Sequence, residues 1–428
     1  MNNIFKDRVS LYFGKDSDKY LEELNKPCTQ GFFLNTNKAN KQDILDLIDF
    51  DYKESNLNEN SYYHNEDNIG KTKAYELGLI YPQEIAASLT TSFVDTNNVK
   101  IVVDMCAAPG GKTINIINRL PKDTLVISND VNHKRVLALS QNIERLGFVN
   151  SIVTNKEIKD LTKVLENKVD LVILDAPCSG EGMIRKYREI LDDYSIDNIN
   201  SLALIQSDLL ENAYRMLKGN GQLVYSTCTY AFEEDEKQVT NFLNKHNDMH
   251  LIDLGDVYAS KLKGTIKLSP LNNTEGQFIS LMVKDNNEEK ANIKYLKTIK
   301  EKIVDDFIKD NIEIDNYYLY KHNDYYYLSL IPLLDLGNNV IKPGIQVGQI
   351  INKRFEPSHN LYRCNNLKYK YVYDLKDDEY DIYITGNELK VDLDDHYYEI
   401  TYKNHSLGFG KVSQKHLKNK YPKGLRRL

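Results

Sequence analysis

Residues 99–113, reading VKIVVDMCAAPGGKT, constrain the fold of this chain more than any other stretch. The first six are rich in β-branched apolar side chains and predict a buried strand that ends near Asp104. A proline and two glycines follow, and residues 113–120 then have the apolar periodicity of a helix. Glycines let a ligand approach the backbone closely, and a helix N-terminus offers free N–H groups to an anion. Strand, glycine turn and helix in this order predict a site for a nucleoside cofactor.

A second strand is predicted at residues 124–128 and ends in Asn129-Asp130. An acidic residue at this place can accept hydrogen bonds from ribose hydroxyls. Two glycines after a strand can also serve packing alone, so the turn by itself leaves that alternative open. From here the chain alternates strands with helices, which is typical of a parallel sheet. We therefore predict a doubly wound α/β domain, with helices at 132–146, 199–217 and 233–246 and strands at 150–154, 169–174, 222–226 and 278–283.

The flanking regions have a different texture. Residues 1–80 are polar and predict a small α+β domain. The α/β domain is predicted at residues 81–285, and it begins with helical periodicity over residues 81–93. Residues 286–314 are charged and predict a linker with a solvated helix. Residues 315–428 alternate apolar and polar side chains in period two, which predicts a mostly β domain.

Composition excludes several classes of protein. The 428 residues are enough for two or three domains. No apolar run approaches the length of about eighteen residues that a membrane helix needs. The first residues lack a basic segment followed by an apolar core, so we expect no signal peptide. Five cysteines without a CxxC pair indicate a reducing cytoplasm and neither a disulfide scaffold nor a metal site.

The net charge of −7 argues by itself against a nucleic-acid partner, but its distribution does not. Residues 403–428 contain six Lys and two Arg and no acidic residue. A basic end on an acidic chain is compatible with a phosphate-contacting edge, or with a solvated tail. The candidate phosphate contacts are Lys411, Lys415, Lys418, Lys420, Lys423, Arg426 and Arg427.

Two cysteines follow strands of the predicted sheet. Cys178 lies in DAPCSG directly after the apolar strand at 169–174, and Cys228 lies in TCT after the strand at 222–226. In open α/β sheets, ligands bind at the carboxyl ends of the strands, so both cysteines are expected to face the cofactor crevice. A single cysteine at such a place is often a small core residue. Two of them, each at a strand end of the same sheet and one beside an Asp-Ala-Pro turn, are harder to explain by packing.

The segments DMCAAPGGKT, LDAPCSGEGMIRK and LVYSTCTYAFEEDE, in this order and spacing, resemble the RNA 5-methylcytosine methyltransferases of the Nop/Sun family. The similarity extends to YPQEIAASL and, at the end of the chain, to GKVSQKHLKNKYPKGLRR. That last segment resembles the C-terminal domain of the bacterial branch that modifies small-subunit ribosomal RNA, the RsmF group. The resemblance implies a Rossmann-like class I methyltransferase domain, an N-terminal RNA-binding extension, a PUA-like C-terminal domain and S-adenosylmethionine as cofactor.

The resemblance also implies roles for the two cysteines. Cys228 would add to C6 of cytosine, which makes C5 carbanion-like and able to accept a methyl group. Cys178 would assist release, Asp175 would hydrogen-bond the cytosine edge near N3, and Lys112 would help to place cofactor and base. The implied cofactor-binding residues are Cys106, Ala107, Ala108, Pro109, Gly110, Gly111 and Lys112 around the methionine moiety, Asp130 at the ribose, Glu157 at the adenine, and Asp175.

The chain departs from the family pattern at a few places. The family usually has Asp where Glu157 stands, and Glu157 could instead cap a helix. Asn-Pro is replaced by Ala231-Phe232, Pro-Ser by Ile85-Ala86, and an expected Arg by Lys267. These changes remove no catalytic group, and we expect them to affect how the protein binds RNA.

The implied partner is RNA, either small-subunit ribosomal RNA or the assembling subunit, and the expected protein is a cytoplasmic monomer without membrane or metal. Three alternatives remain. A transfer RNA cytosine-C5 methyltransferase shares the motifs, and a catalytically inactive ribosome assembly factor shares the RNA-binding parts. A DNA cytosine methyltransferase would use a Pro-Cys nucleophile, which Pro177-Cys178 matches, but the second cysteine and the basic C-terminal domain favour RNA.

Overall fold

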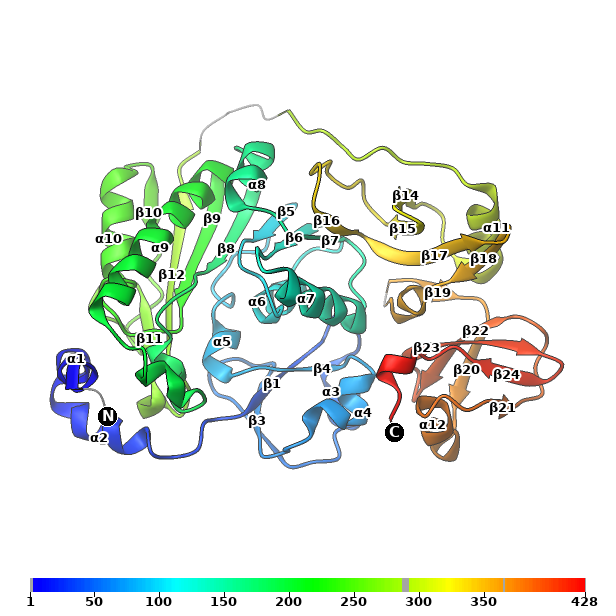
Figure 1. The fold of residues 1–428 in the computed structure, drawn as a ribbon, viewed down its shortest axis with the longest axis horizontal. Coiled ribbons are helices and arrows are strands. Elements are labelled where there is room, and N and C mark those ends of the chain that lie inside the picture. The colour runs from blue at the N-terminus through cyan, green and yellow to red at the C-terminus, as the bar shows by residue number, and fades with distance from the viewer. Residues whose placement is uncertain (1–2, 287–291, 365, 428) are drawn as a thin grey trace.

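The computed structural model describes residues 3–286, 292–364 and 366–427, and within these ranges the strands form five sheets. Figure 1 shows the large central sheet at the left and centre, the N-terminal sheet below it, and the sheets of the C-terminal half on the right. The C-terminus lies between the C-terminal sheet and the N-terminal sheet (Figure 1). None of the helices within the described ranges has the length and apolar character needed to cross a bilayer.

The central sheet has the order β10-β12-β9-β8-β5-β6-β7-β16, and β11 also pairs with β12. The strands from β9 to β7 run parallel, and the chain leaves β5 first toward β6 and β7 and then toward β8 and β9. This confirms the predicted doubly wound α/β domain, whose topological switch point lies between β5 and β8. Its strands are β5 (Ile101–Asp104), β6 (Leu125–Asn129), β7 (Ser151–Thr154), β8 (Val169–Asp175), β9 (Leu217–Thr227), β10 (Met249–Leu251), β11 (Ile266–Leu268), β12 (Gln277–Lys284) and β16 (Val340–Pro343).

Helices cover both faces of this sheet because successive strand residues point to opposite sides. Val102 and Val126 face the side of α6, whereas Val103 and Ile127 face the side of α8 and α9. The Asn132 side chain caps α7 by accepting from two backbone N–H groups, and Gly147 ends the helix at φ +82°. The helices are α5 (Ile85–Leu89), α6 (Gly111–Ile117), α7 (His133–Leu146), α8 (Ile158–Leu165), α9 (Ile196–Met216) and α10 (Glu236–Lys245).

The helix expected over residues 81–93 is shorter than the periodicity indicates. Residues 80–82 instead form β4, which pairs with β1 of the N-terminal sheet, and the helix begins only at Ile85, where Glu84 caps it. Pairing with a distant strand outweighs the local helical pattern here. The N-terminal sheet has the order β2-β3-β1-β4, with β1 (Gly31–Leu34), β2 (Tyr52–Glu54), β3 (Ser61–His64), β4 (Ile80–Pro82), α3 (Lys41–Leu45) and α4 (Lys73–Glu76).

Residues 3–24, which we call the N-terminal arm, lie apart from that sheet. The arm contains α1 (Asn3–Phe13) and α2 (Ser17–Glu23), and Figure 1 shows both at the lower left, below the β11 end of the central sheet. Its apolar side chains form one core cluster with residues that follow β8 and β9. The members of this cluster include Phe5, Val9, Tyr20, Leu24, Ile184, Tyr194, Ile199 and Tyr230.

The C-terminal half is mostly β, as expected, but it does not stand alone. β16 leaves this half and pairs with β7, so it extends the central sheet. The Arg363 guanidinium donates to carbonyls of Ser406, Leu407, Glu76 and Arg145, which joins three parts of the chain. Removing the chain after about residue 315 would take away β16 and expose the edge of β7. A loss of RNA binding in such a truncated protein could therefore come from damage to the central sheet.

Two further sheets make up most of this half, ordered β14-β15-β17-β18 and β20-β22-β23-β24-β21. The helix expected to be solvated, α11, buries Val304 and Ile308 completely on one face. The elements are α11 (Lys302–Asn311), β13 (Ile312–Glu313), β14 (Tyr318–His322), β15 (Tyr325–Ser329), β17 (Ile345–Ile351), β18 (Arg354–Pro357), β19 (Lys368–Tyr369), β20 (Val372–Leu375), α12 (Asp377–Ile384), β21 (Leu389–Lys390), β22 (Tyr397–Tyr402), β23 (His405–Ser413) and β24 (His416–Asn419).

Candidate active site

The glycine turn after β5 brings the backbone close to its neighbours. Gly110 precedes α6 at φ +118°, a conformation that side-chain-bearing residues rarely adopt. A Cβ on Gly111 would lie 2.8 Å from Nε2 of Gln83, so a side chain there would have to displace Gln83. Asp104, at the end of β5, is fully buried and accepts a hydrogen bond of 2.6 Å from Thr113 Oγ1. Burial raises the pKa of Asp104 to about 7.

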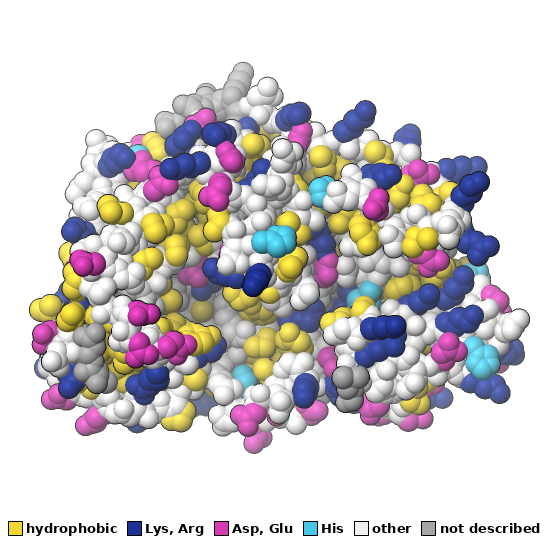
Figure 2. Space-filling view, viewed as in Figure 1, with side chains coloured by type: hydrophobic (Ala, Val, Ile, Leu, Met, Phe, Trp, Pro, Cys, Tyr) yellow, Lys and Arg dark blue, Asp and Glu magenta, His cyan; other side chains and the backbone are white. Residues whose placement is uncertain are grey.

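A cavity of about 150 Å³ lies against this turn. Figure 2 shows the molecule hollowed near the centre of this face, between the central and N-terminal sheets. Most of the expected turn residues line this cavity, together with Tyr81, Pro82 and Gln83 of β4 and its turn, which were not expected at the site. The lining is completed by Ala87, Asp104, Cys106, Ala107, Ala108, Pro109, Gly111, Lys112 and Asp175.

Two buried carboxylates at this edge suit a ligand that carries hydrogen-bond donors. Within the described residues, Asp104 Oδ1 and Asp130 Oδ2 accept no hydrogen bond, although Asp130 Oδ2 lies 3.3 Å from Arg135 Nη2. Asp130 Oδ1 accepts from the Asn132 N–H at 2.9 Å. Buried acceptors without donors are rare in folded proteins. The amino and ribose hydroxyl groups of S-adenosylmethionine are donors of the required kind, so the residues present fit this cofactor.

Glu157 does not share that cavity. It is exposed at the start of α8, where its side chain makes no capping hydrogen bond. Its contact with the adenine remains a prediction.

The two cysteines meet at the carboxyl ends of β8 and β9. Their Sγ atoms are 3.2 Å apart, and the Cys228 N–H lies 3.3 Å from Cys178 Sγ. That both face the cofactor crevice stays a prediction, because neither lines the cavity at the glycine turn. The contact with the Cys228 thiol, together with burial, holds the pKa of Cys178 well above its usual value. Both cysteines are free thiols.

A lysine–aspartate pair stands beside the cysteines. Lys112 Nζ lies 2.6 Å from Asp175 Oδ2, and Asp175 Oδ1 accepts from Ser226 Oγ at 2.7 Å. Burial lowers the pKa of Lys112, but the Asp175 carboxylate outweighs it, so the pKa is raised and Lys112 stays charged. Negative charge on Cys228 would also favour the charged form of Lys112. A thiolate near a fixed cation is the usual state of a nucleophilic cysteine.

Buried acidic residues hold the turn that follows β9. Glu234 accepts from the Ser179 N–H at 3.0 Å and from Gln206 Nε2 at 2.8 Å. Asp235 accepts from Lys267 Nζ at 2.8 Å, so the lysine that replaces the expected arginine keeps an ion pair at this place. The acidic run after TCT was the signal in the sequence that could have revealed this support.

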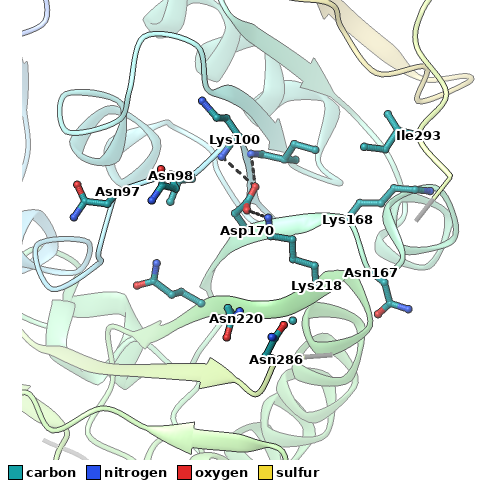
Figure 3. A pocket seen from close by; sticks show the side chains of 14 residues that line it. Asn97, Asn98, Lys100, Asn167, Lys168, Asp170, Lys218, Asn220, Asn286 and Ile293 are labelled. Carbon is teal, nitrogen blue, oxygen red and sulfur yellow. Dashed lines mark hydrogen bonds and ion pairs between the residues drawn. The ribbon is translucent and has the colours of Figure 1, made fainter. Parts of the chain in front are cut away.

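A second, larger cavity lies at the opposite edge of the sheet. It measures about 690 Å³ and is lined by residues at the amino ends of β5, β8 and β9. Figure 3 shows Asp170 there, paired with Lys218 and bonded to the backbone at Lys100 and Ile101. Neither of the two cysteines lines this cavity or the smaller one, but the smaller one contains Lys112 and Asp175, which stand beside them. In open α/β sheets ligands bind at the carboxyl edge, which places the candidate site at the smaller cavity.

Comparison with known proteins assigns the chain to a family. Three family models match successive parts: the N-terminal domain of 16S rRNA methyltransferase RsmF at 1–85, 16S rRNA methyltransferase RsmB/F at 91–283, and the methyltransferase RsmF PUA domain at 370–427. A tRNA (cytosine(49)-C(5))-methyltransferase of Pyrococcus abyssi is 32% identical over 285 residues, which are 62% of this chain and 91% of that protein. The chain belongs to the RsmB/F methyltransferase family. Membership confirms S-adenosylmethionine as the cofactor and the PUA-like character of the C-terminal domain.

Two further RsmB/F relatives are named ribosomal RNA small subunit methyltransferase F. The protein of Aeromonas salmonicida is 36% identical over 45% of this chain and 41% of its own length. That of Salmonella newport is 31% identical over 56% of this chain and 53% of its own length. The matches to these two relatives thus span about half of each protein.

Solved structures agree with the fold. A methyltransferase homologue from Pyrococcus horikoshii is 28% identical with a TM-score of 0.59, covering 66% of this chain and 95% of that one. NSun6 from Pyrococcus horikoshii, at 20% identity and a TM-score of 0.58, covers 66% of this chain and 98% of that one and shows the shared fold alone.

Proposed function

We propose that this protein transfers a methyl group from S-adenosylmethionine to C5 of a cytosine in small-subunit ribosomal RNA, with Cys228 as the nucleophile. The observation that carries the proposal is the pair of thiols 3.2 Å apart, beside a charged lysine and its aspartate, at the ligand-binding edge of the sheet. The names of the Aeromonas and Salmonella relatives support the ribosomal substrate.

Each residue of the site has a chemical task in this proposal. Cys228, as the attacking thiolate beside the Lys112 ammonium, adds to C6 of cytosine, and the electrons displaced from the C5–C6 bond make C5 nucleophilic. S-adenosylmethionine, when bound, supplies the electrophilic methyl group. Asp175 is fixed by Lys112 and Ser226, and it accepts hydrogen bonds from the cytosine edge at N4 and protonated N3.

Cys178 completes the cycle by removing the C5 proton, directly or through a water, so that the Cys228–C6 bond can break. Its neighbouring thiol is the largest cause that raises the pKa of Cys178. When Cys228 is consumed in the bond to C6, that cause disappears, whereas burial and the Glu234 charge still raise the pKa. Cys178 then ionises more readily at the stage where a base is needed.

RNA must present an unstacked cytosine to thiols in a crevice, which suits single-stranded or looped RNA. Lys411 and Lys418 in the C-terminal sheet, and Lys420 just after β24, are exposed and can contact phosphates. Two residues of the expected set are engaged within the protein: Arg427 pairs with Glu76, and Arg426 donates to the Tyr421 carbonyl at 3.1 Å. The remaining candidates are Lys415, which pairs with Asp392, and exposed Lys423.

A transfer RNA substrate is the second candidate. The Pyrococcus abyssi relative, named for transfer RNA, is matched over 91% of its length, more fully than the ribosomal relatives. An inactive assembly factor is disfavoured because both thiols and the Lys112–Asp175 pair are assembled at one edge. We further propose that the protein acts in the cytoplasm as a monomer.

The test is methyl transfer from labelled S-adenosylmethionine to ribosomal RNA, to assembled small subunits and to transfer RNA. Cys228→Ala should lose more than about 10³-fold in rate, because the nucleophile is absent. Cys178→Ala should form an RNA adduct that survives a denaturing gel, because release is blocked. Cys28→Ala, a cysteine elsewhere in the chain, is the control and should behave as the wild type. Methylation by Cys228→Ala would contradict the proposal and point to Cys178 as the nucleophile.

A further inference from the structure

The backbone that follows Cys228 is held by the loop that carries the other cysteine. The Gly182 N–H donates to the Cys228 carbonyl at 2.9 Å, and the Gly182 carbonyl accepts from the Gly276 N–H at 2.9 Å. A Cβ on Gly182 would lie 2.5 Å from Gly276 Cα, so these three segments pack without space for a side chain. The position of Cys228 is therefore set by this loop as well as by β9.

Glu181 is the polar centre of this contact. Its side chain is fully buried. Oε2 accepts from Thr229 Oγ1 at 3.1 Å and from the Tyr230 N–H at 3.0 Å, which are the two residues after Cys228. Oε1 accepts from Tyr12 at 3.3 Å and from Tyr194. One carboxylate thus binds the nucleophile's turn on one side and two tyrosine hydroxyls on the other.

The second side of Glu181 reaches into the N-terminal arm. Tyr12 belongs to α1, and Arg8, one helical turn earlier, pairs with Glu233 in the segment after Cys228. The rings of Phe13 and Tyr20 pack against Tyr230 with centroids 5.2 and 5.6 Å away. The arm therefore contacts the Cys228 turn through aromatic packing, an ion pair and the Glu181 carboxylate.

We propose that Glu181 and Tyr12 are positioning residues for Cys228, so that the N-terminal arm sets the rate at which the thiolate attacks cytosine. The inference rests on the proposed role of Cys228. A buried carboxylate with four donors fixes the backbone of its partners more tightly than apolar packing does, since each bond is directional and charge-assisted. Removing one donor lets the turn shift, and displacement of a reacting atom by about 1 Å can cost about 10²-fold in rate.

The experiment compares single hydroxyls and single carboxylates in the full-length protein. Tyr12→Phe should lower kcat about tenfold and Glu181→Ala about 10²-fold, with the KM for RNA and the affinity for S-adenosylmethionine by calorimetry unchanged. Glu181→Gln keeps one acceptor oxygen and should recover part of the loss. In a Cys178→Ala background, the rate of RNA adduct formation should fall by the same factor as kcat, because the attack itself is slowed.

Tyr20→Phe is the matched control. Tyr20 is buried in the same arm, but its hydroxyl is not among the groups that bond Glu181. It should leave kcat unchanged even where the melting temperature falls, and a loss equal to that of Tyr12→Phe would show that the arm supports folding only. Wild-type kcat in both Tyr12→Phe and Glu181→Gln would overturn the inference. An active Cys228→Ala enzyme would instead overturn the proposed function, so the two failures are distinguishable.

Discussion

The two edges of the central sheet offer a direct comparison, because each has a cavity and a lysine–aspartate pair. At the amino edge, the cavity is the larger one, and its Asp170 is satisfied by Lys218 and two backbone N–H groups. At the carboxyl edge, the cavity is smaller, but it lies beside two thiols in contact and against a buried carboxylate oxygen to which no described residue donates. Buried polar groups that lack hydrogen-bond partners within the protein indicate a functional site, whereas the volume of a cavity says little about function.

The largest expected effect is a difference in kcat between variants of Lys112 at the carboxyl edge and of Lys218 at the amino edge. Lys112→Met should lower kcat about 10²–10³-fold at saturating cofactor, because the cation beside Cys228 is lost and Asp175 is left without its ion-pair partner. Lys218→Met removes the corresponding lysine of the amino edge and should keep kcat within about twofold of the wild type. Single-turnover methyl transfer measures both. Equal losses in the two variants would contradict the distinction between the edges.

A smaller effect concerns the buried carboxylate of the carboxyl edge. The pKa of Asp104 is about 7 in the folded protein because of burial, and near 3.8 in the unfolded chain. Between these values the folded state holds a proton that the unfolded state has lost, so stability falls as pH rises from about 4 to about 7. Asp104→Asn removes this slope. Relative to the wild type, its free energy of unfolding should rise between pH 5 and pH 8 by on the order of 2 kcal/mol.

Urea unfolding of the cofactor-free protein at several pH values measures this change. Asp123→Asn is the control: the ion pair with Lys100 lowers the pKa of exposed Asp123, so this variant should keep the wild-type slope above pH 5. A wild-type slope in Asp104→Asn would show that the carboxylate is ionised throughout.

The smallest effect extends the comparison to the C-terminal sheet. Lys411 and Lys418 are directly opposite each other on β23 and β24, and both are exposed. Like charges opposite one another destabilise a sheet by a few tenths of a kcal/mol, which a polyanion would offset. Replacing both by Ala should raise the KM for RNA and reduce the slope of log affinity against log salt by about 0.7 for each lost phosphate contact, with kcat unchanged.

The control for this pair is Lys159→Ala with Lys245→Ala, two exposed lysines of α8 and α10. This double variant should keep the wild-type salt slope. Filter binding at several salt concentrations compares the two, and thermal unfolding should show the Lys411 and Lys418 variant to be as stable as the wild type or slightly more so.

Much of the candidate site could be predicted from the sequence because it depends on strand ends. The strand and glycine turn at residues 99–113 specified β5 and α6, and the bond between Thr113 and Asp104 closes within that same stretch. Both cysteines follow apolar strands, so their presence at one edge follows from the parallel sheet. Their contact required more: β8 and β9 must be neighbours, with Asp175 opposite Ser226.

The rest depends on contacts between distant parts of the chain. β4 replaced an expected helix because it pairs with β1, and this pairing brings Tyr81 and Gln83 to the cofactor turn. β16 joins β7 from the C-terminal half, although nothing in its local pattern indicates that partner. Hydrophobic periodicity reports which face of an element is buried and carries no information on what covers it.

By itself, the sequence determined the alternation of strands and helices, the glycine turn and a cysteine after each of two strands, since each is encoded in residues close together along the chain. The cofactor followed from the family resemblance. Only the tertiary structure decided that the N-terminal arm packs away from the N-terminal sheet and against the turn that follows Cys228. The physical reason is that Tyr12, Glu181 and Tyr230 acquire their hydrogen bonds and their burial only when three separate segments are packed together.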